Sequence, residues 1–180
     1  MTLVISKEQI ALAPKVLLHD HLDGGLRPQT MIDHALASGY MKLPSYEPEQ
    51  LAKWFVEACS SGTLELYLET FEHTISVMQT TEEIIRVARE CVLDLAADNV
   101  VYAEVRGAPE LFTRKGLTMD QVIEATVEGF NQGMAEAAHN GKKIRVEHIL
   151  CALRQNHVSE EVATKVVKYK GRGVVGFDIA

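Results

Sequence analysis

Two histidines separated by one residue are the feature of this sequence best suited to chemistry. His19 and His21 follow a short apolar run at residues 16–18, and a Gly-Gly pair comes soon after them. That pattern is typical of a buried β-strand that runs into a tight turn. Side chains at positions i and i+2 of a strand point the same way, so both imidazoles are expected on one face. They could then share one metal ion, with metal–nitrogen distances of about 2.1 Å for zinc.

The carboxylates near this pair differ in their expected direction. Asp23 shares the parity of His19 and His21 if the strand continues into the turn, where it could bind a substrate hydroxyl or support a ligand. Asp20 has the opposite parity and is a poorer candidate. Two imidazoles on a strand also arise as structural residues. A catalytic metal usually has three or more protein ligands, so further ligands would have to come from elsewhere.

Other polar residues fall in a second and a third strand-like segment. Glu104 and Arg106 share a face of residues 100–106, which predicts an ion pair at the strand end, more often structural than catalytic. His148, in residues 144–153, is expected either as a satisfied buried histidine or as a residue that faces a site. The remaining histidines are expected in surface or capping roles: His34, His73, His139 and His157.

The elements that must position these residues alternate along the chain. Strand-like segments at 100–106, 144–153 and 174–180 follow the first strand, and helical periodicity fills residues 49–98, 118–139 and 158–170. Thr118, with Gln121 at the capping-box position, and Ser159 are possible N-caps of the last two helices. This alternation predicts an α/β fold of parallel β/α units. In barrels of such units the site lies at the carboxyl ends of the strands, where the histidine pair falls.

A helical stripe between the first two strands has two interpretations. Its apolar members repeat at i, i+3, i+4 and i+7, which is most simply a core face. A helix packed over a barrel mouth could instead use the same face to line an apolar substrate pocket. The residues concerned are Leu64, Tyr67, Leu68 and Phe71.

Composition excludes several classes of protein. The 180 residues carry a formal net charge of −7 and are 47% hydrophobic, as in a globular chain without the basic excess of a nucleic-acid binder. No apolar run reaches the length of a membrane span, so no membrane partner is expected. The three cysteines are odd in number and widely spaced, which favours a reducing compartment, here the cytoplasm.

Four segments in collinear order resemble one family. They read PKVLLHDHLDGGLRP, VVYAEVRGAPE, IRVEHILCALR and GVVGFDIA, and together they cover nearly the whole chain. They are similar to segments of the adenosine deaminases, in the metal-dependent amidohydrolase superfamily. The resemblance implies a (β/α)8 TIM barrel with one Zn2+. It also implies a reaction of purine metabolism, the hydrolytic deamination of adenosine or deoxyadenosine to inosine or deoxyinosine plus ammonia.

The resemblance also implies roles for individual residues. His19 and His21 would be zinc ligands, and His21 would also lie against the bound purine nucleoside. Asp23 would bind the ribose 5′-hydroxyl, whereas relatives that act on the free base tend to carry glutamate there. The helical stripe would cover the purine. Gly107 departs from the family, because relatives usually have an aromatic residue at that position.

The family's remaining site residues belong to segments that this sequence does not contain. These segments supply the third histidine ligand, the catalytic glutamate and the metal-binding aspartate. A (β/α)8 barrel needs roughly 250 residues, and four strands are expected here. Residues 1–180 are therefore expected to be the N-terminal part of one barrel domain, about the first four β/α units. No catalytic residue is expected in this chain, and we expect it to be inactive alone.

Two other functions fit the same sequence. The chain could be a non-catalytic half-barrel that pairs with its missing C-terminal half, or with another chain, through open sheet edges. It could also belong to a deaminase of adenine or of a modified nucleoside. A panel of adenosine, deoxyadenosine and adenine as substrates would separate the last alternative from the first.

Overall fold

Four parallel strands form one sheet in the order β1-β2-β3-β4. The structure is a computed structural model, and it describes residues 5–180. Each strand pairs with the next one along the chain, as the alternation of elements predicted. This topology is that of one half of an eight-stranded parallel barrel. The strands are β1 (Lys15–His21), β2 (Val100–Gly107), β3 (Arg145–Ala152) and β4 (Val174–Ile179).

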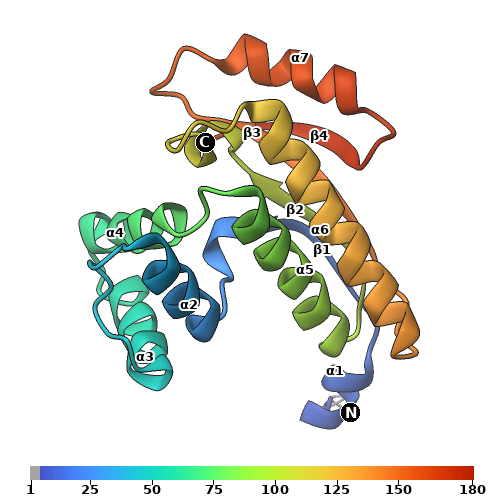
Figure 1. Cartoon of the computed structure of the whole chain (residues 1–180). Helices are drawn as coiled ribbons and strands as arrows, with labels where there is room; N and C mark the ends of the chain where they lie inside the picture. Colours follow the sequence, from blue (N-terminus) through green and yellow to red (C-terminus); the bar gives the residue numbers. More distant parts are fainter. Residues whose placement is uncertain (1–4) are drawn as a thin grey trace.

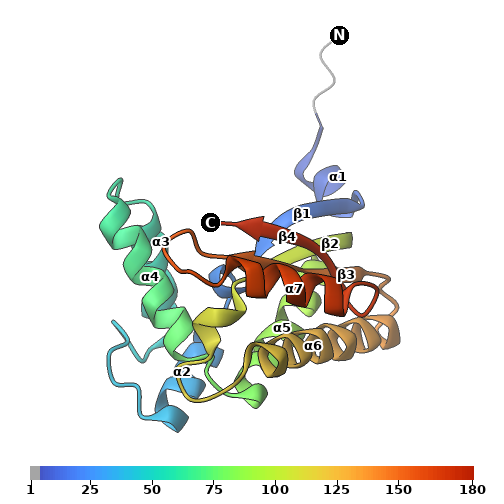
Figure 2. The same cartoon turned by 90° about the horizontal axis from the view of Figure 1, so that it is seen from above.

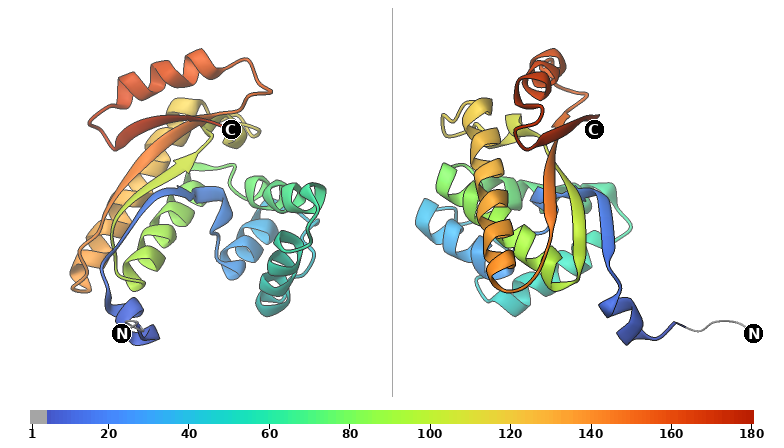
Figure 3. Two further views of the ribbon diagram at one scale, coloured as in Figure 1. Left: turned by 180° about the vertical axis from the view of Figure 1, so that it is seen from behind. Right: turned by 90° about the vertical axis from the view of Figure 1, so that its right-hand side faces the viewer.

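Three helices, each directly before a strand, cover one face of the sheet (Figures 1 and 3). They are α5 (Thr81–Ala97), α6 (Met119–His139) and α7 (Ser159–Tyr169). The core lies between this helical layer and the sheet, since alternate side chains of β2 and β3 point toward the helices. Buried residues at this interface include Ala103, Val105, Val146, Val87 and Phe130.

A second group of helices separates β1 from β2. A 3-10 turn, η1 (Leu22–Gly24), leads from β1 into α2 (Pro28–Ser38), α3 (Pro48–Cys59) and α4 (Leu64–Ser76). These helices have a smaller core of their own, which includes Met31, Leu51 and Val77. Figure 2 shows α3 and α4 on the side toward which β4 points. The group therefore lies by the carboxyl ends of the strands. The other short elements are α1 (Lys7–Leu12) and η2 (Pro109–Phe112).

The helix caps follow the sequence in one case and depart from it in another. Thr118 caps α6, and its side chain exchanges hydrogen bonds with Gln121 in a capping box, as predicted. Ser159 is not a cap. It is the first residue of α7, Val158 precedes it as the N-cap, and no side-chain hydrogen bond closes that end.

The first strand is more exposed than its apolar sequence predicted. Val16 and Leu18 are 55% and 60% exposed, so the expectation of a buried strand is wrong for the described residues. The reason is that β1, within residues 5–180, pairs only with β2 and lies at an edge of the sheet. None of the helices in that range has both the length and the apolar composition that a membrane crossing requires.

Candidate active site

The two histidines of β1 lie on the same side of the sheet, as predicted. Their ring centroids are 5.3 Å apart and the ring planes are tilted by 58°. The pairing register of β1 with β2 shifts between Leu17 and Asp20, so the strand is not regular at this point. Asp20 nevertheless stands opposite Val105, a core residue, and its carboxylate accepts the backbone N–H of His21 at 3.0 Å. Asp20 is therefore directed away from the pair.

Arg106 connects the two imidazoles. Its Nη1 atom lies 3.3 Å from His19 Nε2 and 3.3 Å from His21 Nε2. The same guanidinium pairs with Asp178 on β4 at 3.2 Å and donates to Cys151 Sγ on β3. Four strands thus contribute to one polar cluster on the face of the sheet opposite the helical layer.

The sequence did not predict this cluster. It assigned Glu104 as the partner of Arg106, and that assignment is wrong: Glu104 accepts a hydrogen bond from Tyr102 at 2.8 Å, and Arg106 pairs with Asp178. Cys151 and Asp178 were missed entirely. Register could have found them, because Asp178 stands opposite Cys151 in the β3–β4 ladder, but register is not visible in a single sequence.

Burial and charge favour the neutral form of His21. Its pKa is lowered, first by burial and then by the positive charge of Arg106. A neutral imidazole has a free lone pair and can ligate a metal.

Asp23 lies in the 3-10 turn rather than in a continued strand. The turn buries its side chain next to His21, with Asp23 Oδ1 3.8 Å from His21 Nδ1. Asp23 is only 8% exposed, at the edge of a cavity, and this burial raises the pKa of its carboxyl. The predicted strand parity is therefore wrong for Asp23, although the turn still brings it next to His21.

A cavity of about 330 Å³ opens beside this cluster. That volume is within the range of small-molecule sites, roughly 300–1,000 Å³. His21, Asp23 and Arg106 form its polar side, and residues of α4 form much of its apolar side. The segments that follow β2 and β3 complete it, together with Ala180, which comes directly after β4. The other lining residues are Gly107, Ala108, Leu111, Leu153, Gln155, Ala180, Tyr67, Leu68, Phe71 and Ile75.

The helical stripe of α4 contributes to the cavity, but not with all its members. Tyr67, Leu68 and Phe71 line the cavity, whereas Leu64 does not. Leu64, Tyr67 and Leu68 are 65%, 41% and 54% exposed, so the core interpretation of the stripe is wrong for these three. Phe71 alone reaches the core, and its ring lies 6.3 Å from that of His21.

Two of the other histidines are buried rather than at the surface. His34 Nδ1 is hydrogen-bonded to the Val77 carbonyl at 3.0 Å, and His73 Nδ1 to the Tyr40 hydroxyl at 2.9 Å. The surface expectation is wrong for both, because their partners come from distant parts of the chain. His139 and His157 are exposed, as expected.

His148 is buried but not satisfied. It is 2% exposed, packs edge-on against Phe130 of α6, and neither ring nitrogen has a hydrogen-bond partner. It faces the helical layer, so the alternative of a residue facing the site does not hold. A Cβ atom at Gly107 would lie 3.2 Å from His148 Nε2. The glycine therefore leaves room for the imidazole.

Glu110 was not predicted to have a role. It lies in η2, just beyond β2, and its carboxylate accepts the Leu153 N–H at 3.1 Å and the Asn156 side-chain amide at 2.6 Å. It therefore ties the end of β2 to the loop that follows β3. Leu153 and Gln155 of that loop line the cavity.

The donor set fits half of a metal site. Both Nε2 atoms are directed at a common point, where Arg106 Nη1 contacts them. Imidazole nitrogens are ligands that zinc favours. Within residues 5–180, no group of three or more histidine, cysteine, aspartate or glutamate side chains is arranged to hold a metal ion. The pair therefore suits a metal only in combination with further ligands.

The fold and the paired imidazoles together indicate a class of protein, the amidohydrolase-type barrels. The chain matches half of a parallel (β/α)8 barrel of the amidohydrolase type. The sequence profile of the adenosine deaminase family matches residues 14–180, and the chain belongs to that family. An adenosine deaminase from Mycobacteroides abscessus is 53% identical over 180 residues, which is 100% of this chain and 50% of that protein.

Solved structures share the fold. An N6-mAMP deaminase from Arabidopsis superposes with a TM-score of 0.78 at 24% identity, over 96% of this chain and 52% of that one. An amidohydrolase from Burkholderia ambifaria with bound zinc gives a TM-score of 0.73 at 25% identity, over 99% of this chain and 48% of that one. The chain thus spans about half the length of the relatives that it matches.

Proposed function

We propose that this chain supplies the first half of a zinc-dependent adenosine deaminase site. The reaction is the hydrolysis of adenosine or deoxyadenosine to inosine or deoxyinosine plus ammonia. The observation that carries the proposal is the convergence of His19 Nε2 and His21 Nε2 on one point beside an apolar cavity. Family membership supports the deaminase chemistry, and a zinc-containing amidohydrolase of the same fold supports the choice of metal.

Five residues at and beside the cavity have definite tasks in this proposal. His19 and His21 hold the zinc through Nε2, and zinc, when bound, activates water for attack on the purine carbon that bears the amino group. Asp23 binds a ribose hydroxyl through its carboxylate, because it is the buried acidic group at the cavity edge. Tyr67 and Phe71 of α4 pack over the purine and exclude bulk water from it.

The proposal requires the second half of the site to come from residues other than 5–180. Residues 5–180 contain two of the ligands that a catalytic zinc needs, and a general acid must protonate the purine ring nitrogen. We propose that residues 1–180 form the N-terminal part of one barrel domain and release no ammonia alone. The exposed apolar side chains of the edge strands, among them Val16, Leu18 and Val175, are where the remaining strands would pack.

A chimera tests the proposal. This chain would be joined to the second half of the Mycobacteroides abscessus relative, which is 53% identical over the shared half. We expect the zinc-loaded chimera to release ammonia from adenosine and deoxyadenosine, and the isolated chain to release none. His21→Ala in the chimera should abolish the reaction. His139→Ala, at the exposed end of α6, is the matched control and should leave it unchanged.

The substrate panel separates the deaminase alternatives. A nucleoside enzyme should lose most of its kcat/KM for adenine, because adenine has no ribose for Asp23 to bind. Asp23→Ala should then reduce the preference for adenosine over adenine. A folded, zinc-containing chimera that releases ammonia from adenine but not from adenosine would refute the nucleoside assignment. A folded chimera that is inactive on all three compounds would refute the deaminase proposal and favour a half-barrel interaction module.

A further inference from the structure

One nitrogen atom of Arg106 lies between the two imidazoles of the proposed zinc site. Nη1 is 3.3 Å from His19 Nε2, 3.3 Å from His21 Nε2 and 3.2 Å from Asp178 Oδ2. The Arg106 side chain is only 11% exposed, so water screens its charge weakly. A protein cation thus lies where the ring nitrogens converge.

The contacts fix the protonation pattern of both rings. A guanidinium has five N–H donors and no acceptor, so each ring nitrogen that it contacts must accept. His19 and His21 therefore carry a lone pair on Nε2 and a hydrogen on Nδ1. That neutral tautomer is the form in which Nε2 can ligate a metal. Arg106 consequently holds both rings in the form that metal binding requires.

The same atom also obstructs the metal. A zinc ion would lie about 2.1 Å from each Nε2 atom, whereas Nη1 of Arg106 now lies 3.3 Å from each. A metal bound by both rings would therefore overlap the guanidinium, so the two cannot occupy the space between the rings together. The two positive charges also repel each other. Arg106 has other partners that do not involve the rings: Asp178 contacts Nη1 and Cys151 Sγ contacts Nη2. These residues lie on β3 and β4 and can retain Arg106 when it leaves the histidines.

We propose that Arg106 is a place-holding cation that keeps His19 and His21 ready for a divalent metal and competes with that metal for the point between them. The inference rests on the proposed function, because it takes these histidines as metal ligands. Metal entry moves Nη1 off both rings, and the guanidinium stays paired with Asp178 and Cys151.

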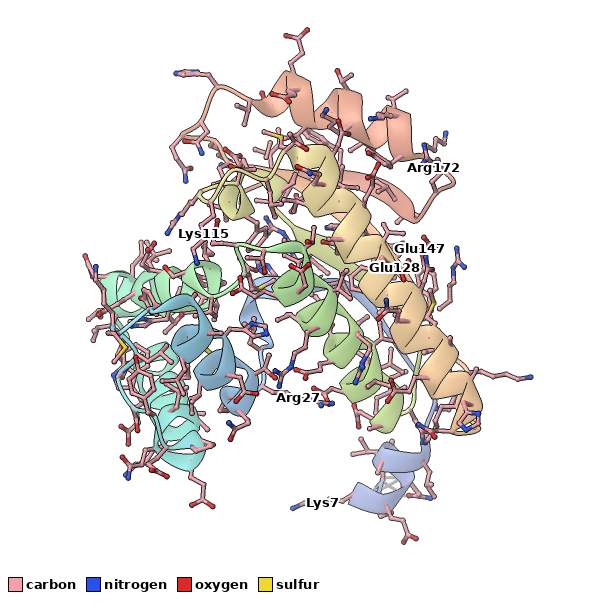
Figure 4. All side chains as sticks on the ribbon, viewed as in Figure 1. Lys7, Arg27, Lys115, Glu128, Glu147 and Arg172 are labelled. Atoms are coloured by element: carbon pink, nitrogen blue, oxygen red, sulfur yellow. The ribbon has the colours of Figure 1, made fainter. Side chains whose placement is uncertain are left out.

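Cobalt titration of the metal-free chimera, which adds the second half of the site, tests the competition without any activity assay, since Co2+ bound to imidazole has visible absorption; the unsubstituted chimera serves as the wild type. Arg106→Met removes the charge and should bind Co2+ at least about tenfold more tightly than the wild type. Arg106→Lys keeps the charge and should bind as the wild type does. Arg172→Met is the matched control, because Arg172 lies in the turn between α7 and β4, at the other end of that strand (Figure 4).

A second measurement does not depend on the fold of any variant. In NMR spectra of the unsubstituted chimera labelled with 15N-arginine, the Arg106 side-chain protons should be protected from solvent exchange without metal. Saturating Zn2+ should change these signals and should move the His19 and His21 ring nitrogens to metal-bound shifts.

In the cobalt titration, adding His21→Ala to Arg106→Met should cancel the gain in cobalt affinity.

The possible outcomes separate the two proposals. Equal cobalt affinity of the wild type and Arg106→Met, with loss of binding in His21→Ala, would overturn the competition and leave the zinc site intact. Arg106 signals that do not respond to saturating zinc would also overturn it. No metal binding by any variant would overturn both the competition and the zinc assignment of this histidine pair.

Discussion

A buried histidine with no partner should make this protein sensitive to acid. Burial lowers the pKa of His148 from 6.5 to about 3, and both of its ring nitrogens lack hydrogen-bond partners. In the unfolded chain the ring takes up a proton near its ordinary pKa, whereas in the folded chain it stays neutral until the pH reaches about 3. The unfolded state therefore binds more protons between these values, and stability falls as the pH falls.

The size of the effect follows from the two pKa values. One pKa unit corresponds to about 1.4 kcal/mol. The free energy of unfolding should fall, through His148 alone, by about 2–3 kcal/mol between pH 7 and pH 4.5. Near pH 3 the loss should reach about 4 kcal/mol. Since small proteins are stable by only about 5–15 kcal/mol, a loss of this size would be a large fraction of the total stability.

Urea denaturation of the wild type and of His148→Leu at the two pH values measures this contribution. Leucine has a similar volume and no polar atoms, so the variant should be at least as stable as the wild type at neutral pH. At the acid pH it should be more stable by about 2–3 kcal/mol. His157→Gln controls for the loss of an imidazole from the surface. If His148→Leu loses as much stability on acidification as the wild type does, the reasoning is wrong.

Three further predictions concern packing and local structure. Gly129→Ala should cost roughly 1–3 kcal/mol of unfolding free energy in denaturant titrations, because the new Cβ would lie 2.5 Å from the Ile85 carbonyl oxygen; a variant as stable as the wild type would contradict this. Thr80→Ala removes the hydroxyl that accepts the Glu83 N–H. This loss should lower the free energy of unfolding by about 1 kcal/mol and, with it, the midpoint of thermal unfolding. Glu110→Gln should speed hydrogen exchange in the loop after β3, and unchanged exchange there would refute its anchoring role.

Some features of the fold could be predicted because their causes are local. The order of strands and helices follows from apolar periodicity, and the cap of α6 follows from the spacing of Thr118 and Gln121. The shared direction of His19 and His21 follows from the two-residue repeat of a strand. All of these depend on residues within a few positions of one another.

Other features depend on which segments meet. His34 and His73 were expected at the surface, but Val77 and Tyr40 supply buried partners from elsewhere in the chain. The stripe of α4 was expected either in the core or along a pocket, yet a residue such as Leu64 is in neither place and stays exposed, because the helix covers the end of the sheet rather than its face. Periodicity says which side of a helix is apolar, but not what that side contacts.

The sequence by itself determined that this chain forms parallel β/α units with two imidazoles at the end of the first strand. Only the tertiary structure decided what surrounds those imidazoles. Strand register placed Arg106 between the rings and gave it Asp178 as a partner, and a 3-10 turn brought Asp23 beside them. The physical reason is that local patterns fix the direction of each side chain, whereas contacts between strands depend on how distant segments align.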